Sequence, residues 1–386
     1  MKHKIATRMA SFAPFHVMEL LGRARELESQ GKSIIHMEIG EPDFSTPQTI
    51  VDAGITALKN NQTKYTPSLG LPQLREVLAE FYQHYFCAPI SPHNIAITPG
   101  SSGALLIACG VLVNPGDEVL LTDPGYPCNK QFVQLMGGVP RFINLSEKNQ
   151  YQIELEQIKS HWNEKTRCIF LASPSNPTGS VIPQEILAEI AKFAESNNGY
   201  VILDEIYLGL SYQSEIKSFA GKFDNVFIVS SFSKFFCMTG WRVGWLIAPT
   251  EFMSSVDKMA QNVFLAASTP SQYAALAAFQ PDTLVTLEQY RDEFKKRRDY
   301  LSQAVQQLGF DLSEVPQGAF YLYLNSKKFS EDSSELAESL LENAGVAITP
   351  GKDFGVNNTE SHIRIAYTTS QKNLEIGIQR IADYLA

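Results

Sequence analysis

A single lysine, Lys234, stands in the middle of the segment SSFSKFFCMTGWRVGW, which spans residues 230–245. The segment follows the apolar run DNVFIV, so the chain places this lysine where a buried strand leaves the core. A lysine that is desolvated there and lies close to a second cation, Arg242, should have a lowered pKa. Its neutral amine would then be free to attack a carbonyl carbon, and this is the chemistry that the segment predicts.

Small residues that can bind an anion follow two of the apolar runs. They are Gly100, Ser101 and Ser102 in PGSSGAL, and Ser231 and Ser233 beside the lysine. The first three stand where a loop becomes a helix, so their N–H groups and hydroxyls can meet an anion at the positive end of a helix dipole. Arg242 can bind the same anion from the other side with a bidentate contact. Taken alone, a Gly-Ser pair before a helix is more often a cap, and only the convergence favours a phosphate site.

Three further side chains could hold a flat, charged ring. Asp204 directly follows the apolar run YVIL, where a carboxylate is costly unless it is paired, and it could hold a proton on a heterocyclic nitrogen. Tyr207 could reach a phenolate on the same ring, and Tyr126, after DPG, could stack on its face. A helix cap for Asp204 and core packing for the tyrosines are the alternatives. An aldehyde ring with a phosphate, a ring nitrogen and a phenolic oxygen would use all these groups, and pyridoxal 5'-phosphate is that molecule.

These residues are expected at one edge of a mostly parallel sheet. Between residues 95 and 247, short apolar runs such as CIFLAS and YVILD alternate with longer amphipathic ones, which is typical of an α/β domain with helices on both faces. Ligands of such sheets bind beyond the carboxyl ends of the strands. Four candidates follow their runs closely: Tyr126, Asn176, Asp204 and Lys234. Later strand and helix signals predict a second, smaller α+β domain, with the long helical stretch 284–308 as the bridge.

Length, charge and cysteine content limit the class of protein. The 386 residues, 44% of them hydrophobic, can bury a full core in two domains. A net charge of -9 at pH 7 disfavours a nucleic-acid or anionic-membrane partner and favours a small-molecule ligand. Five cysteines without a C-x-x-C pair argue against disulfides and zinc, so no metal is expected. No apolar run suits a signal peptide or a membrane span, so we expect a soluble, cytoplasmic protein.

The order of the motifs resembles the fold-type I pyridoxal-phosphate aminotransferases of class I/II, the group that contains the aspartate aminotransferases. The resemblance covers nearly the whole chain, through IGEPDF, KYTPSLGLPQLREVLA, TPGSSGAL, DPGYP, SPSNPTG, DEIY, SFSKFFCMTGWRVGW, GAFY, TPGKDFG and HIRIAY. It implies an α/β fold: a large domain with a mostly parallel, seven-stranded type of sheet between helices, plus a smaller α+β domain. The implied divisions are an N-terminal segment, residues 1–45, that joins the small domain, a large cofactor-binding domain, 46–282, and a small C-terminal domain, 283–386.

The resemblance also implies roles around the cofactor ring for the residues at matching positions. Lys234 is implied to hold pyridoxal 5'-phosphate covalently and then to move the substrate Cα proton. Asp204 is implied to keep the ring nitrogen protonated, so that the ring can accept electrons. Asn176 and Tyr207 are implied to hydrogen-bond the ring oxygen, and Tyr126 to stack on the ring.

Further roles that the resemblance implies concern the phosphate, the substrate and the partner subunit. The implied phosphate cup consists of Gly100, Ser101, Ser102, Ser231, Ser233 and Arg242. Tyr65 is implied to reach the phosphate in the neighbouring subunit, so a homodimer with shared active sites is expected. Arg364 is implied to bind the substrate α-carboxylate as a fork, with help from Asn176 and from the Gly40 backbone.

The implied reaction is a ping-pong transamination between an L-amino acid and a 2-oxo acid. L-Aspartate and 2-oxoglutarate are the leading pair, in amino acid biosynthesis, and alanine or aromatic amino acids are alternative donors. Phe15 and His16 stand where the N-terminal segment of relatives closes over the substrate, but they fit helix-start packing as well. The rival functions are a C–S β-lyase on the same fold and a non-catalytic regulator. Such regulators carry an added DNA-binding domain, which the early start of the motifs is expected to exclude.

Overall fold

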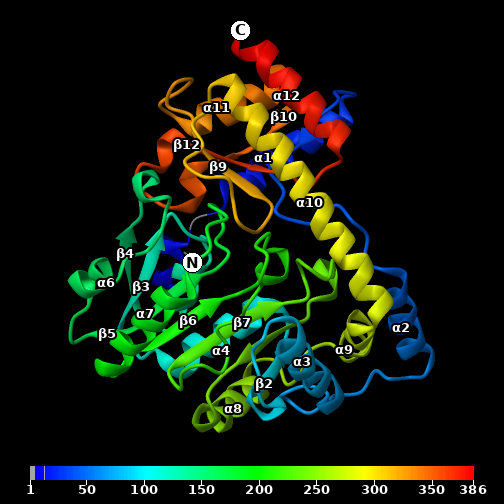
Figure 1. The fold of residues 1–386 in the computed structure, drawn as a ribbon, viewed down its shortest axis with the longest axis vertical. Helices are drawn as coiled ribbons and strands as arrows, with labels where there is room; N and C mark the ends of the chain where they lie inside the picture. Colours follow the sequence, from blue (N-terminus) through cyan, green and yellow to red (C-terminus); the bar gives the residue numbers. More distant parts are fainter. Residues whose placement is uncertain (1–4, 13) are drawn as a thin grey trace.

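The computed structural model describes residues 5–12 and 14–386, and its larger part is built on a seven-stranded sheet (Figure 1). The strand order is β2-β8-β7-β6-β5-β3-β4. The strands are β2 (Ile95–Thr98), β3 (Glu118–Asp123), β4 (Val139–Asn144), β5 (Thr166–Ala172), β6 (Tyr200–Asp204), β7 (Val226–Ser231) and β8 (Gly244–Ile247). All neighbours are parallel except β8, which runs antiparallel to both β2 and β7. The prediction of a mostly parallel sheet is confirmed.

Alternate residues of the strands pack into two cores, one on each face of this sheet. In β5, Cys168 and Phe170 belong to one core and Ile169 and Leu171 to the other, because successive side chains of a strand point to opposite faces. The helices over the first core are α4 (Gly100–Leu112), α5 (Asn129–Leu135) and α8 (Met253–Val263). Those over the second are α3 (Pro72–Tyr85), α6 (Leu155–His161) and α7 (Gln184–Ser196). Burial on both faces explains why the strands read as continuous apolar runs.

The smaller part combines residues from both ends of the chain (Figure 1). Its antiparallel sheet has the order β11 (Thr349–Pro350), β12 (His362–Ala366) and β9 (Tyr321–Asn325), and a parallel pair joins β1 (Ile35–His36) to β10 (Val346–Ala347). The helices of this part are α1 (His16–Ser29), α11 (Ser333–Ser339) and α12 (Gln371–Leu385). Met37 links the two sheets, since its N–H donates to the Ala347 carbonyl at 2.9 Å and its carbonyl accepts from the Ala366 N–H at 2.7 Å. The domain limits 45/46 and 282/283 stay predictions.

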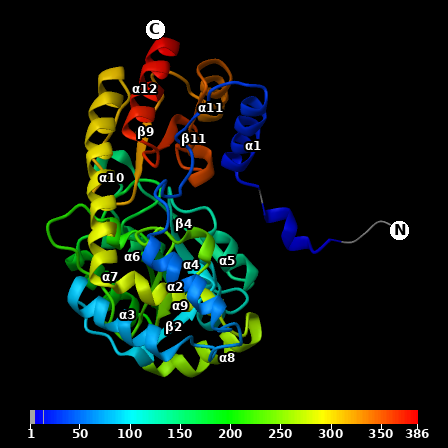
Figure 2. The same ribbon diagram turned by 90° about the vertical axis from the view of Figure 1, so that its right-hand side faces the viewer.

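One long helix, α10 (Pro281–Leu308), runs from the larger part to the smaller (Figures 1 and 2). It begins at a proline, which is tolerated because an N–H group at the first position of a helix has no acceptor within the helix. It ends at Gly309, whose φ of 96° suits a left-handed C-terminal cap. Helices α2 (Gln48–Lys59) and α9 (Thr269–Leu276) pack against each other near its start. The bridging helix is confirmed, and it begins at Pro281 rather than at Leu284.

Two further findings concern bilayer spans and metal ligands. None of the helices in residues 5–12 and 14–386 is both long and apolar enough to cross a bilayer. Across those same residues, no three His, Cys, Asp or Glu side chains are grouped as metal ligands. The five cysteine thiols are free, and Cys109, Cys168 and Cys237 are buried.

Candidate active site

Lys234 lies just beyond the end of β7, at the carboxyl edge of the larger sheet. Its Nζ donates a hydrogen bond to the Gly40 carbonyl oxygen at 2.5 Å. Nζ also lies 5.9 Å from the ring centre of Tyr207 and 5.8 Å from that of Phe320. Because Gly40 and Phe320 come from segments that continue into the smaller part, the lysine stands where the two parts of the molecule meet.

The surroundings of Lys234 favour its neutral form. The pKa of Lys234 is lowered to about 8, mainly by burial and with smaller contributions from the Arg364 and Arg242 guanidiniums. The carboxylates of Glu41 and Asp204 oppose that change in pKa. A substantial fraction of the amine is therefore unprotonated near pH 8, as a nucleophile or a base requires.

Asp204 is the last residue of β6 and is 6% exposed. Its Oδ1 accepts the Ile206 N–H at 2.9 Å, so a turn-capping role accounts for one of its oxygens. Burial raises the pKa of Asp204 to about 7, although the Ile206 N–H and Lys234 both lower it. Its Oδ2 accepts no hydrogen bond from any described residue. A carboxylate in this state is stabilised by a nearby cation, so Asp204 fits the protonated ring nitrogen of pyridoxal 5'-phosphate.

Tyr207 is buried, and its hydroxyl lies 2.8 Å from that of Tyr321. Burial raises the pKa of both phenols, so both keep their protons and can donate. A Cβ atom on Gly40 would lie 2.3 Å from the Tyr321 hydroxyl, so only glycine allows this close approach. Sequence reasoning assigned no role to Tyr321, and the GAFY motif was its only signal.

Arg364 lies in β12, is 5% exposed and is held on three sides. Nη1 donates to the Asn176 Oδ1 at 2.9 Å, and Nη2 donates to the Glu38 carbonyl at 2.8 Å. The guanidinium carbon lies 4.1 Å from the ring centre of Tyr321 and 4.7 Å from that of Phe354. Its buried Nε has no partner in the described part of the chain. A buried donor without an acceptor costs about 1–3 kcal/mol, so the site fits a carboxylate ligand.

The turn at Gly100 and the Arg242 side chain meet at the start of α4. A Cβ on Gly100, whose φ is 70°, would lie 2.5 Å from Arg242 Nη2. The N-cap of α4 is Pro99, which supplies no side-chain cap, so capping does not account for Ser101 or Ser102. The first N–H groups of the helix are therefore left for an anion, with a guanidinium beside them.

Ser231 and Ser233 are hydrogen-bonded to each other. Their hydroxyl oxygens lie 2.9 Å apart, and the Ser231 oxygen also accepts the Ser233 N–H at 3.0 Å. Ser231 further donates to the Val243 carbonyl at 3.0 Å. Since the Ser231 hydroxyl is engaged within the chain, the Ser233 hydroxyl and the Arg242 guanidinium are the groups more available to an anion on this side.

Four candidates lie at the periphery of this cluster. Tyr126 is at the rim, and Tyr65, which is 81% exposed, lies on the loop between α2 and α3. No described residue of the cluster makes a hydrogen bond or ring contact with Tyr65. Phe15 is the N-cap of α1 and His16 its first residue, and the His16 N–H donates to Asp353 Oδ1 at 2.8 Å. Both occupy helix-start positions.

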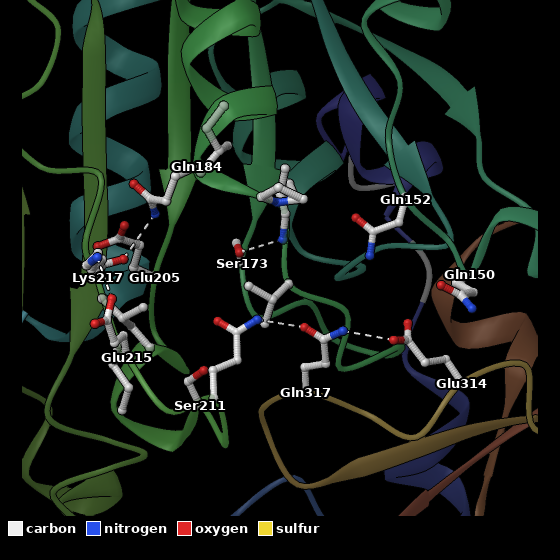
Figure 3. Close-up of a pocket in the computed structure, with 17 residues that line it drawn as sticks. Gln150, Gln152, Ser173, Gln184, Glu205, Ser211, Glu215, Lys217, Glu314 and Gln317 are labelled. Carbon is white, nitrogen blue, oxygen red and sulfur yellow. Dashed lines mark hydrogen bonds and ion pairs between the residues drawn. The ribbon is translucent and has the colours of Figure 1, made fainter.

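A separate cavity of about 400 Å³ lies next to three of the active-site segments (Figure 3). Its lining includes Ser173, Glu205 and Gln317, which are near in sequence to site residues, but none of the predicted site residues lines it. Gln317 Nε2 donates to Glu314 Oε1 at 2.8 Å along one wall. The cavity is therefore distinct from the cluster around Lys234.

Comparisons with known proteins agree with this chemistry. Residues 32–381 match the family of class I and II aminotransferases. The chain is 40% identical to the (5-formylfuran-3-yl)methyl phosphate transaminase of Methanocaldococcus jannaschii, over 99% of each chain. It is 33% identical to the valine–pyruvate aminotransferase of Mycobacterium tuberculosis, over 100% of this chain and 99% of that one. The structure of Thermus thermophilus aspartate aminotransferase with maleate is similar, with a TM-score of 0.93 and 31% identity over 99% of this chain and 100% of that one.

Proposed function

The chain belongs to the class I and II aminotransferase family, and from this premise we propose that it transfers the amino group of L-aspartate to 2-oxoglutarate by a ping-pong mechanism. It is a pyridoxal-phosphate-dependent transaminase, so the alternative of a non-catalytic regulator is wrong. The observation that carries the proposal is the buried Arg364, whose free Nε stands ready for a carboxylate and whose charge acts on Lys234.

We assign the binding of the cofactor to the residues around Lys234. When bound, pyridoxal 5'-phosphate supplies an electron sink for the electron pair left at the substrate Cα when its proton is removed. Lys234 would hold the cofactor, and its amine, of which a substantial fraction is neutral near pH 8, would take the Cα proton. Asp204 would keep a proton on the ring nitrogen, because its buried carboxylate is stabilised by that positive charge.

The other proposed ligands surround the ring and the phosphate. Asn176 and Tyr207 would donate to the ring oxygen, and Tyr126 would cover the ring from the rim. The phosphate would be bound by Gly100, Ser101, Ser102, Ser231, Ser233 and Arg242. Arg364 would orient the substrate by binding the substrate α-carboxylate. The Gly40 backbone would lie beside the bound substrate, and in this structure its carbonyl accepts a hydrogen bond from Lys234.

L-Aspartate is proposed as the donor because the Thermus thermophilus aspartate aminotransferase has a closely similar structure. The relative from Mycobacterium tuberculosis is named for valine, so valine joins alanine and the aromatic amino acids as an alternative. Aspartate carries a second carboxylate and therefore requires a cation besides Arg364. Arg242 cannot serve, because it lies beside Gly100 at the proposed phosphate cup.

The test is a titration of the absorption spectrum of the purified enzyme with L-aspartate, L-alanine, L-phenylalanine and L-valine. Bleaching of the bound chromophore by aspartate, and its return with 2-oxoglutarate, would support the proposal. Bleaching by another donor alone would replace aspartate with that donor. Release of pyruvate and ammonia from cystathionine would instead reveal a C–S β-lyase.

We propose that the enzyme is a homodimer in which Tyr65 serves the partner's active site. The Tyr65 side chain is exposed and makes no hydrogen bond or ring contact with the described residues of the cluster, and exposed Ile55 and Leu58 lie close to it in sequence, on α2. Light scattering should give twice the mass of one chain, and Tyr65→Ala should loosen the cofactor. A monomer with full activity would contradict this. A cytoplasmic location and a role in amino acid biosynthesis remain proposals of the same kind.

A further inference from the structure

Two segments from distant parts of the chain meet at the edge of the active site, and apart from Tyr126 their residues have no role in the mechanism so far. Residues 123–126 begin with the last residue of β3 in the larger part, and residues 351–356 belong to the smaller part. The Gly125 N–H donates to the Phe354 carbonyl at 2.8 Å, and the Val356 N–H donates to Asp123 Oδ2 at 2.9 Å. These contacts, which we call the Asp123 junction, join the two parts of the molecule.

The fit at this junction depends on a glycine. A Cβ atom on Gly355 would lie 1.7 Å from Asp123 Oδ1, so the carboxylate rests directly on the glycine backbone. The φ of Gly355 is 161°, an extended conformation that any residue adopts. The requirement for glycine is therefore one of space, and an added methyl group would displace the carboxylate.

Burying the Asp123 carboxylate carries a desolvation cost that an apolar residue would avoid. Asp123 is 1% exposed, and its Oδ1 has no hydrogen-bond partner in the described residues. Burial raises the pKa of Asp123, against the Val356 and Asn357 N–H groups and Lys130, which lower it. Replacing both partners of a buried hydrogen bond with apolar groups of the same shape can be nearly neutral, so a carboxylate with one unpartnered oxygen is not the only way to stabilise this junction.

The junction connects directly to the residues that surround the substrate. Phe354 lies against the Arg364 guanidinium at 4.7 Å, and its neighbour Asp353 accepts the N–H groups of His16 and Val17 at 2.8 and 2.9 Å. Tyr126, on the other side of the junction, lines the same small pocket as Asp123 and Phe354 and interacts electrostatically with Tyr321 and Asp204. A shift of residues 351–356 would thus move both a wall of the carboxylate site and the start of α1.

We propose that Asp123 is a positioning residue for substrate binding: it fixes residues 351–356 so that Phe354 holds the Arg364 guanidinium in place for the substrate carboxylate. The inference rests on the proposed role of Arg364. The proposal predicts that loss of the Asp123 carboxylate raises the Kd of substrate-like ligands while the Tm changes little.

The test compares Asp123→Leu, Asp123→Asn and Gly355→Ala with the control Glu118→Gln in the cofactor-loaded enzyme. Glu118 is a buried carboxylate at the opposite end of the same strand, bound by Arg141 and Asn163 at 2.7 and 2.9 Å. The probes are 2-methylaspartate and 2-aminoisobutyrate, which have no Cα proton and so bind without being transaminated. Their Kd is read by absorption, together with Tm and with hydrogen exchange of residues 351–358.

Asp123→Leu and Gly355→Ala should bind the probes about tenfold more weakly, since misplacement of a binding group by less than 1 Å suffices for that. Residues 351–358 should exchange faster in both, while the spectrum of the bound cofactor stays as in wild type. Asp123→Asn keeps an oxygen for the Val356 N–H and should bind within about threefold of wild type. Glu118→Gln should change neither the Kd nor the exchange.

Wild-type affinity in Asp123→Leu, or an equal loss in Glu118→Gln, would overturn the inference. A wild-type enzyme that binds neither probe would contradict the proposed function instead. Hydrogen exchange needs no substrate and therefore tests the inference even in that case. If residues 351–358 are as protected in Asp123→Leu as in wild type, the inference is overturned.

Discussion

Asp204→Asn should stabilise the cofactor-free protein while it disables the enzyme. Asp204 is buried, and burial raises its pKa to about 7 from an ordinary value of 3.8. Holding the charged form in the folded protein at pH 8 therefore costs roughly 4 kcal/mol, at about 1.4 kcal/mol for each pH unit between the two pKa values. Asparagine has the same shape, keeps an oxygen for the Ile206 N–H and carries no charge, so most of this cost should disappear.

The stability gain from Asp204→Asn should depend on pH. Because the folded-state pKa of Asp204 lies above the unfolded one, wild type binds this proton more tightly when folded. The contribution of this bound proton to the stability of wild type is full at low pH and is lost as the pH rises through about 7. The variant should exceed wild type by roughly 4 kcal/mol at pH 8 and by about 2 kcal/mol at pH 5. Urea unfolding of the two cofactor-free proteins at both pH values measures the difference.

Glu205 provides a matched control for this experiment. It is the next residue, it is buried, and burial raises its pKa to about 7 as well. Its oxygens accept the Ser218 hydroxyl at 2.5 Å and the Phe219 N–H at 2.8 Å, away from Lys234. Glu205→Gln should gain stability at pH 8 and keep its activity, because a neutral amide at this position leaves Asp204 in place.

Activity separates the two carboxylates. With cofactor restored, Asp204→Asn should lose at least about a hundredfold in kcat, since no carboxylate would hold the ring proton in the dry site. Glu205→Gln should stay within about threefold of wild type. The reasoning is refuted if Asp204→Asn is no more stable than wild type at pH 8, or if Glu205→Gln loses as much kcat as Asp204→Asn.

Three further predictions concern the amine and the carboxylate site. Lys234→Ala should abolish turnover and bind the cofactor only without a covalent bond, and normal transamination by this variant would disprove the assignment. Arg364→Lys should lower kcat/KM about a hundredfold for every amino acid, because a point charge replaces a planar fork, and an unchanged kcat/KM would remove Arg364 from the site. The rate at which the cofactor-free enzyme captures pyridoxal 5'-phosphate should rise with pH and level off above about 8, the pKa of Lys234, and a stopped-flow rate that keeps rising to pH 10 would contradict that value.

Local patterns were sufficient for the elements that carry the site. Continuous apolar runs predicted strands with both faces buried, and β5, β6 and β7 divide their residues between two cores as such strands must. The helical period predicted α10, which starts at Pro281 and stops at Gly309. Because ligands of parallel sheets lie at the carboxyl ends of the strands, the same runs indicated where Asp204 and Lys234 would meet.

Contacts between distant segments could not be predicted in this way. The placement of β8 between β2 and β7 depends on pairing between residues 95–98 and 244–247, and no local period encodes it. Nothing local in the GAFY motif indicates a role for Tyr321, whose hydroxyl meets that of Tyr207 across 114 residues. The Asp123 junction likewise joins segments 233 residues apart.

The order of residue types along the chain already shows which chemistry is present: a lysine, a carboxylate and an anion-binding turn, each placed at a strand end by short-range periodicity. How these groups behave depends on the folded protein. The pKa of Lys234 is near 8 and that of Asp204 near 7 because folding buries them, and the Arg364 Nε has no partner among the described residues, while Asn176 and Glu38 accept from the other two nitrogens. The physical reason is that residue type and local conformation are read along the chain, whereas desolvation and charge proximity exist only once remote segments exclude water together.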